Sequence, residues 1–163
     1  MPRTMEACLK VARQMGARIV RTQGGLYAWY PRRANALPLL KTEVYPGFPT
    51  DLQSAALAVS CKAQGKSVIR ETIFEDRFRM TEALRKMGAD VRHLDEQSVE
   101  TRGKEELFGA NVEALELRGG AALVIAALGA KGETVIAGRH YIDRGYENIC
   151  RDLRELGARI VCE

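Results

Sequence analysis

The chain has 163 residues, enough for one domain with a sizeable core, and its 46% hydrophobic and 28% charged residues exclude a disordered chain. Lys and Arg number 25 against 21 Asp and Glu, so the formal net charge is +4. This small excess favours anionic partners such as phosphorylated small molecules. It falls short of the basic density of nucleic-acid-binding domains, and aromatic stacking motifs are absent, so we predict no nucleic-acid partner.

The four cysteines are widely spaced, with no CxxC pair and no histidine at ligand spacing: Cys8, Cys61, Cys150 and Cys162. We therefore predict no metal site, no cofactor and no disulfide framework, and a reducing, cytoplasmic location. The longest apolar run, residues 121–130, is too short to cross a bilayer, which takes about 20 residues. This run predicts a buried helix rather than a membrane segment.

At the start of the chain, residues 5–20 place apolar side chains at spacing i, i+3, i+4 and i+7. This spacing predicts an amphipathic helix that ends at Gly16, because glycine accepts the left-handed conformation found after helix C-termini. The alternating stretch GLYAWY, residues 25–30, then predicts a strand in which Trp29 serves packing. Arg32 and Arg33 predict a solvated turn.

A complete set of elements follows in the middle of the chain. The first of its two helices is apolar nearly all round and is therefore predicted to be interior, whereas the second is amphipathic and faces water on one side. Two strands close the unit. The predicted order is βαβαββ, with elements near residues 37–44, 51–64, 67–72, 78–87, 89–94 and 98–102.

The last part of the chain repeats this pattern. Residues 120–136, GAALVIAALGAKGETVI, match residues 54–69, SAALAVSCKAQGKSVI, apart from one added residue at the start. Residues 146–161 match the helix and following strand of the earlier copies. The closing strand predicted there has no return strand beside it, and such open edges predict possible self-association.

These matches predict an α+β fold of repeated βαβαββ units, with interior helices and outer mixed sheets. About two and a half repeats form a single domain, 1–163, with a partial repeat at 1–36, a full repeat at 37–105 and a nearly full repeat at 106–163. An alternative interpretation is that the first 30 residues are simply a helix and a hairpin added to two repeats.

Asp51 lies at the start of the first interior helix and allows two interpretations. It can cap free backbone N–H groups together with Thr50, or it can serve as a functional carboxylate. The repeat offset of 67 residues places Arg118 at the equivalent position of the other interior helix. The pair Gly119 and Gly120 there either leaves the helix N-terminus open to an anion or permits close helix packing.

Arg144 follows an expected strand in the sequence YIDRGYE, residues 141–147. An arginine fork can bind a phosphate or carboxylate at two points, or it can pair on the surface with Asp143 or Glu147. The two histidines, His93 and His140, have no acid at suggestive spacing and receive no role.

Four motifs occur in an order and spacing that resemble the UDP-N-acetylglucosamine 1-carboxyvinyltransferase family of enolpyruvyl transferases. They are YPGFPTDLQ at 45–53, ETIFEDRFRMTEALRKMGA at 71–89, LRGGAALV at 117–124 and IDRGYE at 142–147. The resemblance implies a two-domain enzyme, each domain an inside-out α/β barrel of three units, with the active site between them. By this resemblance the chain is most of the C-terminal domain, and its partner is the missing N-terminal domain.

The family reaction adds the 3-hydroxyl of UDP-N-acetylglucosamine to phosphoenolpyruvate and expels phosphate, in peptidoglycan synthesis. The resemblance implies that Asp51 binds the sugar hydroxyl and acts as the base, and that the backbone of Ile73 contacts the sugar nucleotide. Arg118 and Arg144 match arginines on the phosphoenolpyruvate side. Glu116 occupies a substrate-binding position that is usually Asp, which moves the carboxylate by one methylene.

The reactive cysteine of the family lies on a loop of the other domain, and none of the four cysteines here matches it. We therefore expect the isolated chain to be inactive, as part of a transferase. The alternative is a non-catalytic sugar-nucleotide-binding or regulatory module of the same fold. The transferase interpretation expects Asp51, Arg118 and Arg144 to converge on one open face.

Overall fold

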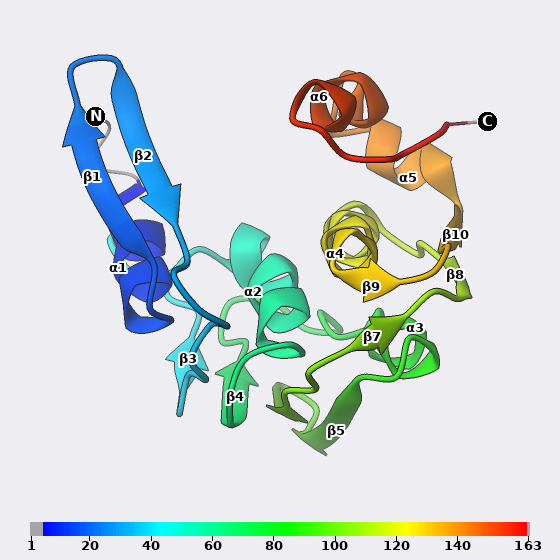
Figure 1. The fold of residues 1–163 in the computed structure, drawn as a ribbon. Helices are drawn as coiled ribbons and strands as arrows, with labels where there is room; N and C mark the ends of the chain where they lie inside the picture. Colours follow the sequence, from blue (N-terminus) through cyan, green and yellow to red (C-terminus); the bar gives the residue numbers. More distant parts are fainter. Residues whose placement is uncertain (1–4, 163) are drawn as a thin grey trace.

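The structure of the protein is a computed structural model that describes residues 5–162. Figure 1 shows its helices and strands along the chain. The elements are α1 (Glu6–Gln14), β1 (Arg18–Thr22), β2 (Gly25–Trp29), β3 (Leu40–Lys41), the 3-10 helix η2 (Thr50–Leu52), α2 (Gln53–Ser60), β4 (Lys66–Arg70), α3 (Thr81–Lys86), β5 (Asp90–Asp95), β6 (Ser98–Arg102), β7 (Leu107–Phe108), β8 (Asn111–Glu113), α4 (Leu117–Leu128), β9 (Ala130–Lys131), β10 (Val135–Ala137), α5 (Arg139–Asp143) and α6 (Ile149–Glu155).

The middle of the chain forms a four-stranded sheet in the order β3-β4-β6-β5. β3 runs parallel to β4, and the other neighbours are antiparallel. This confirms a mixed α+β fold and the predicted succession of elements between residues 40 and 102. The first strand is shorter than predicted: it begins later, where Pro38 has no N–H with which to extend the ladder, and beyond Lys41 only an isolated bridge joins Thr42 to Phe48.

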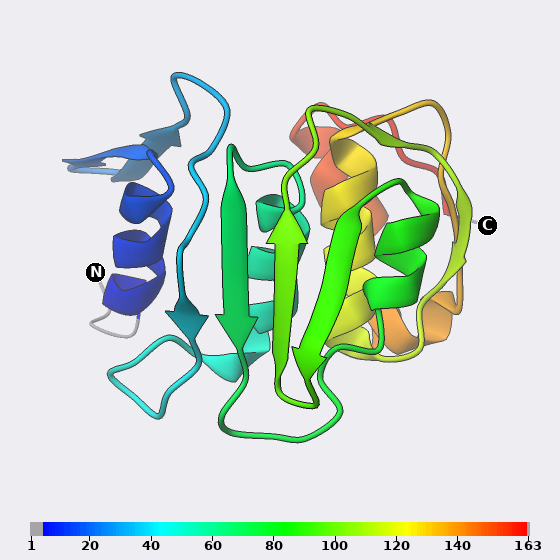
Figure 2. The same ribbon diagram turned by 90° about the horizontal axis from the view of Figure 1, so that it is seen from below.

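Helices cover one face of this sheet, and Figure 2 shows α2 and α4 side by side behind the strands. The inward side chains of the strands are buried between the two layers: Ile69, Val91 and Val99. Leu57 of α2 and Leu123 of α4 are fully buried in the same core. The interior position predicted for both apolar helices is therefore confirmed.

The last part of the chain is less regular than predicted. β7 pairs with β9 and β8 with β10, both in parallel, as two separate two-stranded sheets. Residues 158–162 form no strand, which corrects the predicted closing strand. A strand needs a neighbour to satisfy its backbone groups, and here Arg154 Nε instead donates to the Ile160 carbonyl at 2.7 Å.

The prediction of no disulfide is also wrong, because Cys150 and Cys162 form one. Their Cα atoms are 6.3 Å apart. The two cysteines are 12 positions apart in the sequence, and α6 carries the first of them, so the bond joins the helix to the segment that follows it. The turn after α6 brings Cys150 and Cys162 together. Cys8 and Cys61 are free thiols.

At the start of the chain, β1 and β2 form a hairpin that pairs with no other strand among the described residues. The hairpin projects from the body of the molecule beyond α1 (Figure 1). Within residues 5–162, no helix combines the length and the apolar character needed to cross a membrane.

Two positively charged side chains donate hydrogen bonds to backbone carbonyls at the C-terminal ends of the interior helices. Arg33 donates through Nε to the Lys62 carbonyl and through Nη2 to the Ala63 carbonyl, just beyond α2, so it is not the solvated residue that the sequence predicted. Lys62 in turn donates to the Gly129 carbonyl at the end of α4. Cations are favourable at these positions because helix C-termini carry unpaired carbonyls and partial negative charge.

We expect Arg33→Ala to lower the free energy of unfolding by about 1 kcal/mol, because two carbonyls lose a charged donor. The neighbouring Arg32 is exposed, so Arg32→Ala serves as a matched control and should change stability little. Urea unfolding followed by circular dichroism measures both variants. Equal losses for the two arginines would contradict the capping role.

Candidate functional site

The candidate site lies where α2 and α4 begin. Arg118 Nε donates to Asp51 Oδ1 at 2.5 Å, which forms an ion pair between the two helix starts. Asp51 and Arg118 occupy the same position of the repeat, 67 residues apart. Because α2 and α4 pack side by side, these equivalent positions lie next to each other. The structure therefore brings Asp51 and Arg118 together.

Asp51 does not cap a helix. The N-cap positions of η2 and α2 are Pro49 and Leu52, and no side chain there accepts a hydrogen bond from the N–H groups of either helix start. The capping interpretation of Asp51 and Thr50 is therefore wrong. The Asp51 side chain is 67% exposed, and Arg118 contacts only one of its two carboxylate oxygens. A carboxylate that is exposed and free of capping duty is available to a ligand.

Glu116 is the residue that caps α4. Its carboxylate accepts the Arg118 N–H at 2.7 Å and the Gly119 N–H. These are the N–H groups that a bound anion would use, so the proposed anion site at this helix start is wrong. Capping also places the Arg118 backbone, because the carboxylate of Glu116 is bonded to it directly.

The two glycines at the start of α4 serve close packing. A Cβ on Gly120 would lie 2.7 Å from Ile142 Cγ1 and 3.0 Å from the Cβ of Ala114. A Cβ on Gly119 would lie 2.5 Å from Glu116 Oε1. Of the two interpretations of this pair, the structure supports the one based on packing.

Ile73 is connected to Asp51 through a buried carboxylate that the sequence analysis missed, Glu71. Glu71 Oε1 accepts the Ile73 N–H at 2.8 Å, and Oε2 accepts the Thr50 hydroxyl at 2.9 Å, next to Asp51. Oε1 also accepts from Thr42 at 2.9 Å. Glu71 therefore holds the start of α2 and the backbone after β4 in one arrangement. Only its place in the ETIFEDR motif signalled it.

The hydrogen bonds of Glu71 also set its protonation. Burial raises the pKa of this carboxyl, but hydrogen bonds from the Ile73 N–H, Thr50, Thr42 and the Phe74 N–H outweigh burial and leave the pKa below its ordinary value. The folded state thus favours the ionised form.

A hollow of about 580 Å³ lies beside Ile73. Its lining comes from the loop before α2, from the segment after β4 and from α1: Lys10, Glu43, Val44, Tyr45, Pro46, Gly47, Thr72 and Ile73. Ile73 is thus at an open surface and not in the core.

The loop in this lining is longer than its counterpart in the last repeat. Two hydrogen bonds match between the repeats: the Ala36 N–H donates to the Gln64 carbonyl, and the Gly109 N–H donates to the Lys131 carbonyl. The two acceptors are 67 residues apart in the sequence, whereas the two donors are 73 apart. The middle repeat therefore has six more residues between strand and interior helix. Residues of this longer loop line the hollow. In the last repeat the shorter connection leads to Glu116, the N-cap residue of α4.

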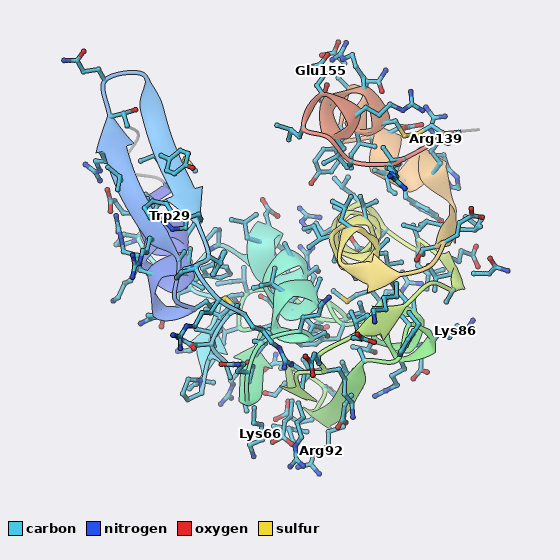
Figure 3. The ribbon with its side chains drawn as sticks, in the orientation of Figure 1. Trp29, Lys66, Lys86, Arg92, Arg139 and Glu155 are labelled. Atoms are coloured by element: carbon cyan, nitrogen blue, oxygen red, sulfur yellow. A yellow bond between two sulfur atoms is a disulfide. The ribbon has the colours of Figure 1, made fainter. Side chains whose placement is uncertain are left out.

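Arg144 is exposed at the C-terminal end of α5. Its neighbour Gly145 lies against Leu117, because an added Cβ would be 2.8 Å from two Leu117 side-chain atoms. The turn that carries Arg144 is therefore next to the start of α4. Asp143 pairs with Arg139 at 3.1 Å, so it is not reserved for Arg144. Figure 3 shows Arg139 on α5, close to α6.

The predicted site residues thus gather at one end of the helix layer. Contacts join Asp51 to Arg118 and Arg118 to Glu116, and Glu71 joins Ile73 to the start of α2. Arg144 lies on the adjacent turn. The expectation was that Asp51, Arg118 and Arg144 converge on one open face, and in the structure the first two of these side chains pair with each other.

Comparisons with known proteins show which proteins this chain is similar to. The family model described as EPSP synthase (3-phosphoshikimate 1-carboxyvinyltransferase) matches residues 2–153. A UDP-N-acetylglucosamine 1-carboxyvinyltransferase of Gloeobacter violaceus is 43% identical over 159 residues, which cover 98% of this chain and 34% of that protein. UDP-N-acetylglucosamine 1-carboxyvinyltransferase 2 of Caldanaerobacter subterraneus is 48% identical over 130 residues, covering 80% of this chain and 31% of that protein.

Among solved structures, the enolpyruvyl transferase NikO from Streptomyces tendae superposes with a TM-score of 0.83 at 24% identity. The match covers 95% of this chain and 36% of that one. EPSP synthase from Acinetobacter baumannii gives a TM-score of 0.64 at 20% identity. The fold is therefore that of the enolpyruvyl transferases, and the chain spans about a third of the length of the proteins it matches.

We expect Glu71→Gln to destabilise the protein and to remove part of its acid sensitivity. Because the folded pKa is lowered, the ionised carboxylate stabilises the fold above its unfolded pKa of about 4.3, and this contribution is lost as pH falls through the folded pKa. Urea unfolding at several pH values between neutral and acidic measures it. The exposed Glu75 offers the control Glu75→Gln. An unchanged pH profile in Glu71→Gln would contradict this account.

Proposed function

Since the chain belongs to the EPSP synthase family of carboxyvinyltransferases, we propose that it forms part of an enolpyruvyl transferase that acts on UDP-N-acetylglucosamine. The enolpyruvyl group of phosphoenolpyruvate is transferred to the 3-hydroxyl of the sugar nucleotide, a step of peptidoglycan synthesis. The names of the relatives at 43% and 48% identity support this substrate, and they favour a transferase over a non-catalytic module. The observation that carries the proposal is the Asp51–Arg118 pair beside the Ile73 loop.

In the proposed reaction, the sugar 3-hydroxyl loses its proton as its oxygen bonds to C2 of phosphoenolpyruvate, and C3 gains a proton. The C2–O bond to phosphate then breaks, and C3 loses a proton to form the new enol ether. We assign the first proton transfer to Asp51, whose exposed carboxylate has an unoccupied oxygen beside the ion pair. Arg118 holds that carboxylate in place through Nε.

The arginines supply positive charge where phosphate and carboxylate are bound. Arg118 uses Nε for Asp51, and its terminal nitrogens remain a second donor edge for an anion. Arg144, exposed on the adjacent turn, provides a second guanidinium. Glu116 is assigned to this binding set through its hold on the Arg118 backbone.

The Ile73 backbone is assigned to the sugar nucleotide. Its N–H is already bonded to Glu71, so the carbonyl is the group left for the ligand. The remaining partner is the other domain of the enzyme, and the proposed location is the cytoplasm, where nucleotide sugars and phosphoenolpyruvate are made. We also propose that open strand edges of the chain can associate with further strands.

The sharpest test places this chain in a complete enzyme. The 159 matching residues of this chain would replace their counterparts in the Gloeobacter violaceus relative, and phosphate release from phosphoenolpyruvate and UDP-N-acetylglucosamine would be measured. We expect an active chimera, in which Asp51→Asn lowers kcat by roughly 100-fold or more, because a positioned acid or base contributes about that factor.

Asp152→Asn is the matched control, since Asp152 is an exposed acid on α6, and it should leave kcat unchanged. A folded chimera that releases phosphate equally well with Asp51→Asn would contradict the role of Asp51. A folded chimera that fails with UDP-N-acetylglucosamine but acts on another acceptor would contradict the proposed substrate.

We further expect the purified 163-residue chain to release no phosphate from the two substrates. The resemblance places the reactive cysteine on the other domain, and here Cys61 is buried while burial raises the pKa of its thiol to about 11. Product formation by the isolated chain would contradict this expectation.

A further inference from the structure

The outer face of the four-stranded sheet carries a cluster of charged side chains. Val91, Val99 and Thr101 are buried on the helix side of β5 and β6, so the residues that alternate with them point to the other side of the sheet. Figure 3 shows Lys66 and Arg92 on this outer side, away from the helix layer. A hollow of about 270 Å³ there is lined by five charged residues of the middle repeat: Lys66, Asp90, Arg92, Glu100 and Arg102.

The pairing of the strands places these side chains in two adjacent rows. In one row Arg102 of β6 lies between Lys66 of β4 and Asp90 of β5, because it pairs with both. In the next row Glu100 pairs with Arg92. Like charges directly opposite each other destabilise a sheet, so the Lys66–Arg102 pair costs stability unless an anion compensates it.

Glu100 compensates two of the three cations. Its Oε2 lies 2.8 Å from Lys66 Nζ, and its Oε1 lies 2.9 Å from Arg92 Nη2. The hydrogen bond from Lys66 and the charge of Arg92 outweigh the effect of burial and lower the pKa of Glu100 below its ordinary value. The ionised carboxylate therefore holds Lys66 and Arg92 in place on the two strands beside β6.

Arg102 is the cation that remains uncompensated. Its side chain is exposed, and it makes no hydrogen bond or ion pair with any residue between 5 and 162. The acid beside it, Asp90, instead lies 3.7 Å from Lys104 Nζ. The guanidinium of Arg102 therefore lines the hollow with all its donors unused.

From this arrangement we propose that the hollow binds the phosphate group of a small molecule. Arg102 donates to two phosphate oxygens through its planar fork, and Lys66 and Arg92 contact the other oxygens with donors that Glu100 does not use. Three cations and two acids give the lining a net charge of +1, which favours a single phosphate group over a polyanion. The inference goes beyond the proposed function, because none of these residues belongs to the candidate site.

NMR titration of the 163-residue chain with inorganic phosphate tests the site. We expect saturable shifts of the backbone amides of β4 and β6, with an affinity in the millimolar range. Arg102→Gln should weaken this affinity by roughly tenfold, because a charged two-point donor is lost. Arg32→Gln, at another exposed arginine, is the control and should leave the affinity unchanged.

Two results of this titration would overturn the proposal. One is the absence of saturable shifts on β4 and β6. The other is a set of shifts that chloride reproduces at the same ionic strength, because screening by salt acts on all exposed charges. Amides at the start of α4 report separately on phosphate binding at the candidate site, so the two sites are distinguished in one experiment.

Urea unfolding gives a second measurement of the same site. Arg102 is exposed and unpaired, so Arg102→Gln should fold with nearly unchanged stability in phosphate-free buffer. Phosphate should raise the unfolding midpoint of the unaltered chain more than that of Arg102→Gln, because a ligand stabilises the folded state that binds it. An equal rise in both proteins would contradict binding at Arg102.

Vesicles distinguish a small molecule from a lipid head group as the source of the phosphate. The 163-residue chain would be sedimented with phosphatidylglycerol vesicles and, for comparison, with phosphatidylcholine vesicles. We expect no vesicle binding that depends on Arg102, because the two acids of the hollow oppose a surface of many anions. Binding to phosphatidylglycerol that Arg102→Gln abolishes, without binding of free phosphate, would overturn the assignment to a small molecule.

Discussion

The packing of α2 against α4 is the interaction on which the rest of the structure depends. Both helices are apolar nearly all round, and Leu57 and Leu123 are fully excluded from solvent. Small residues such as Ala122 and Ala126 let the backbones approach, and they too are buried. Burial of two apolar helices against one sheet supplies the hydrophobic free energy that holds the layers together.

Because the two helices are equivalent parts of a repeat, equivalent positions meet at both ends of the helix pair. Asp51 contacts Arg118 where the helices begin, and Lys62 contacts Gly129 near their ends. Each pair is separated by 67 residues, the offset of the repeat itself. The geometry of the candidate site is therefore a consequence of the internal repeat and not of a local motif.

Periodicity in the sequence predicted the helices, the middle sheet and the equivalence of Asp51 with Arg118. It could not predict the contacts of Glu71 with Thr42 and Thr50 or those of Arg33 with the end of α2, because these partners lie 21 to 30 residues away and are selected by tertiary packing. The same limit explains why Cys150 and Cys162 were not paired and why residues 158–162 were assigned a strand, since a strand depends on a neighbour that local sequence does not specify. The count of repeats remains a prediction.

Two carboxylates at this end of the molecule, Glu71 and Asp51, differ in burial and in the number of their hydrogen bonds. Glu71 is buried, and four donors use its oxygens, so any ligand would have to break an existing network. Asp51 is exposed and paired with a single arginine, and exposed ion pairs contribute only about 0–1 kcal/mol. A hydroxyl or a phosphate can therefore enter the Asp51–Arg118 pair at little cost in stability. Glu71, through Thr50, Ile73 and Phe74, holds the helix start and the loop next to that pair.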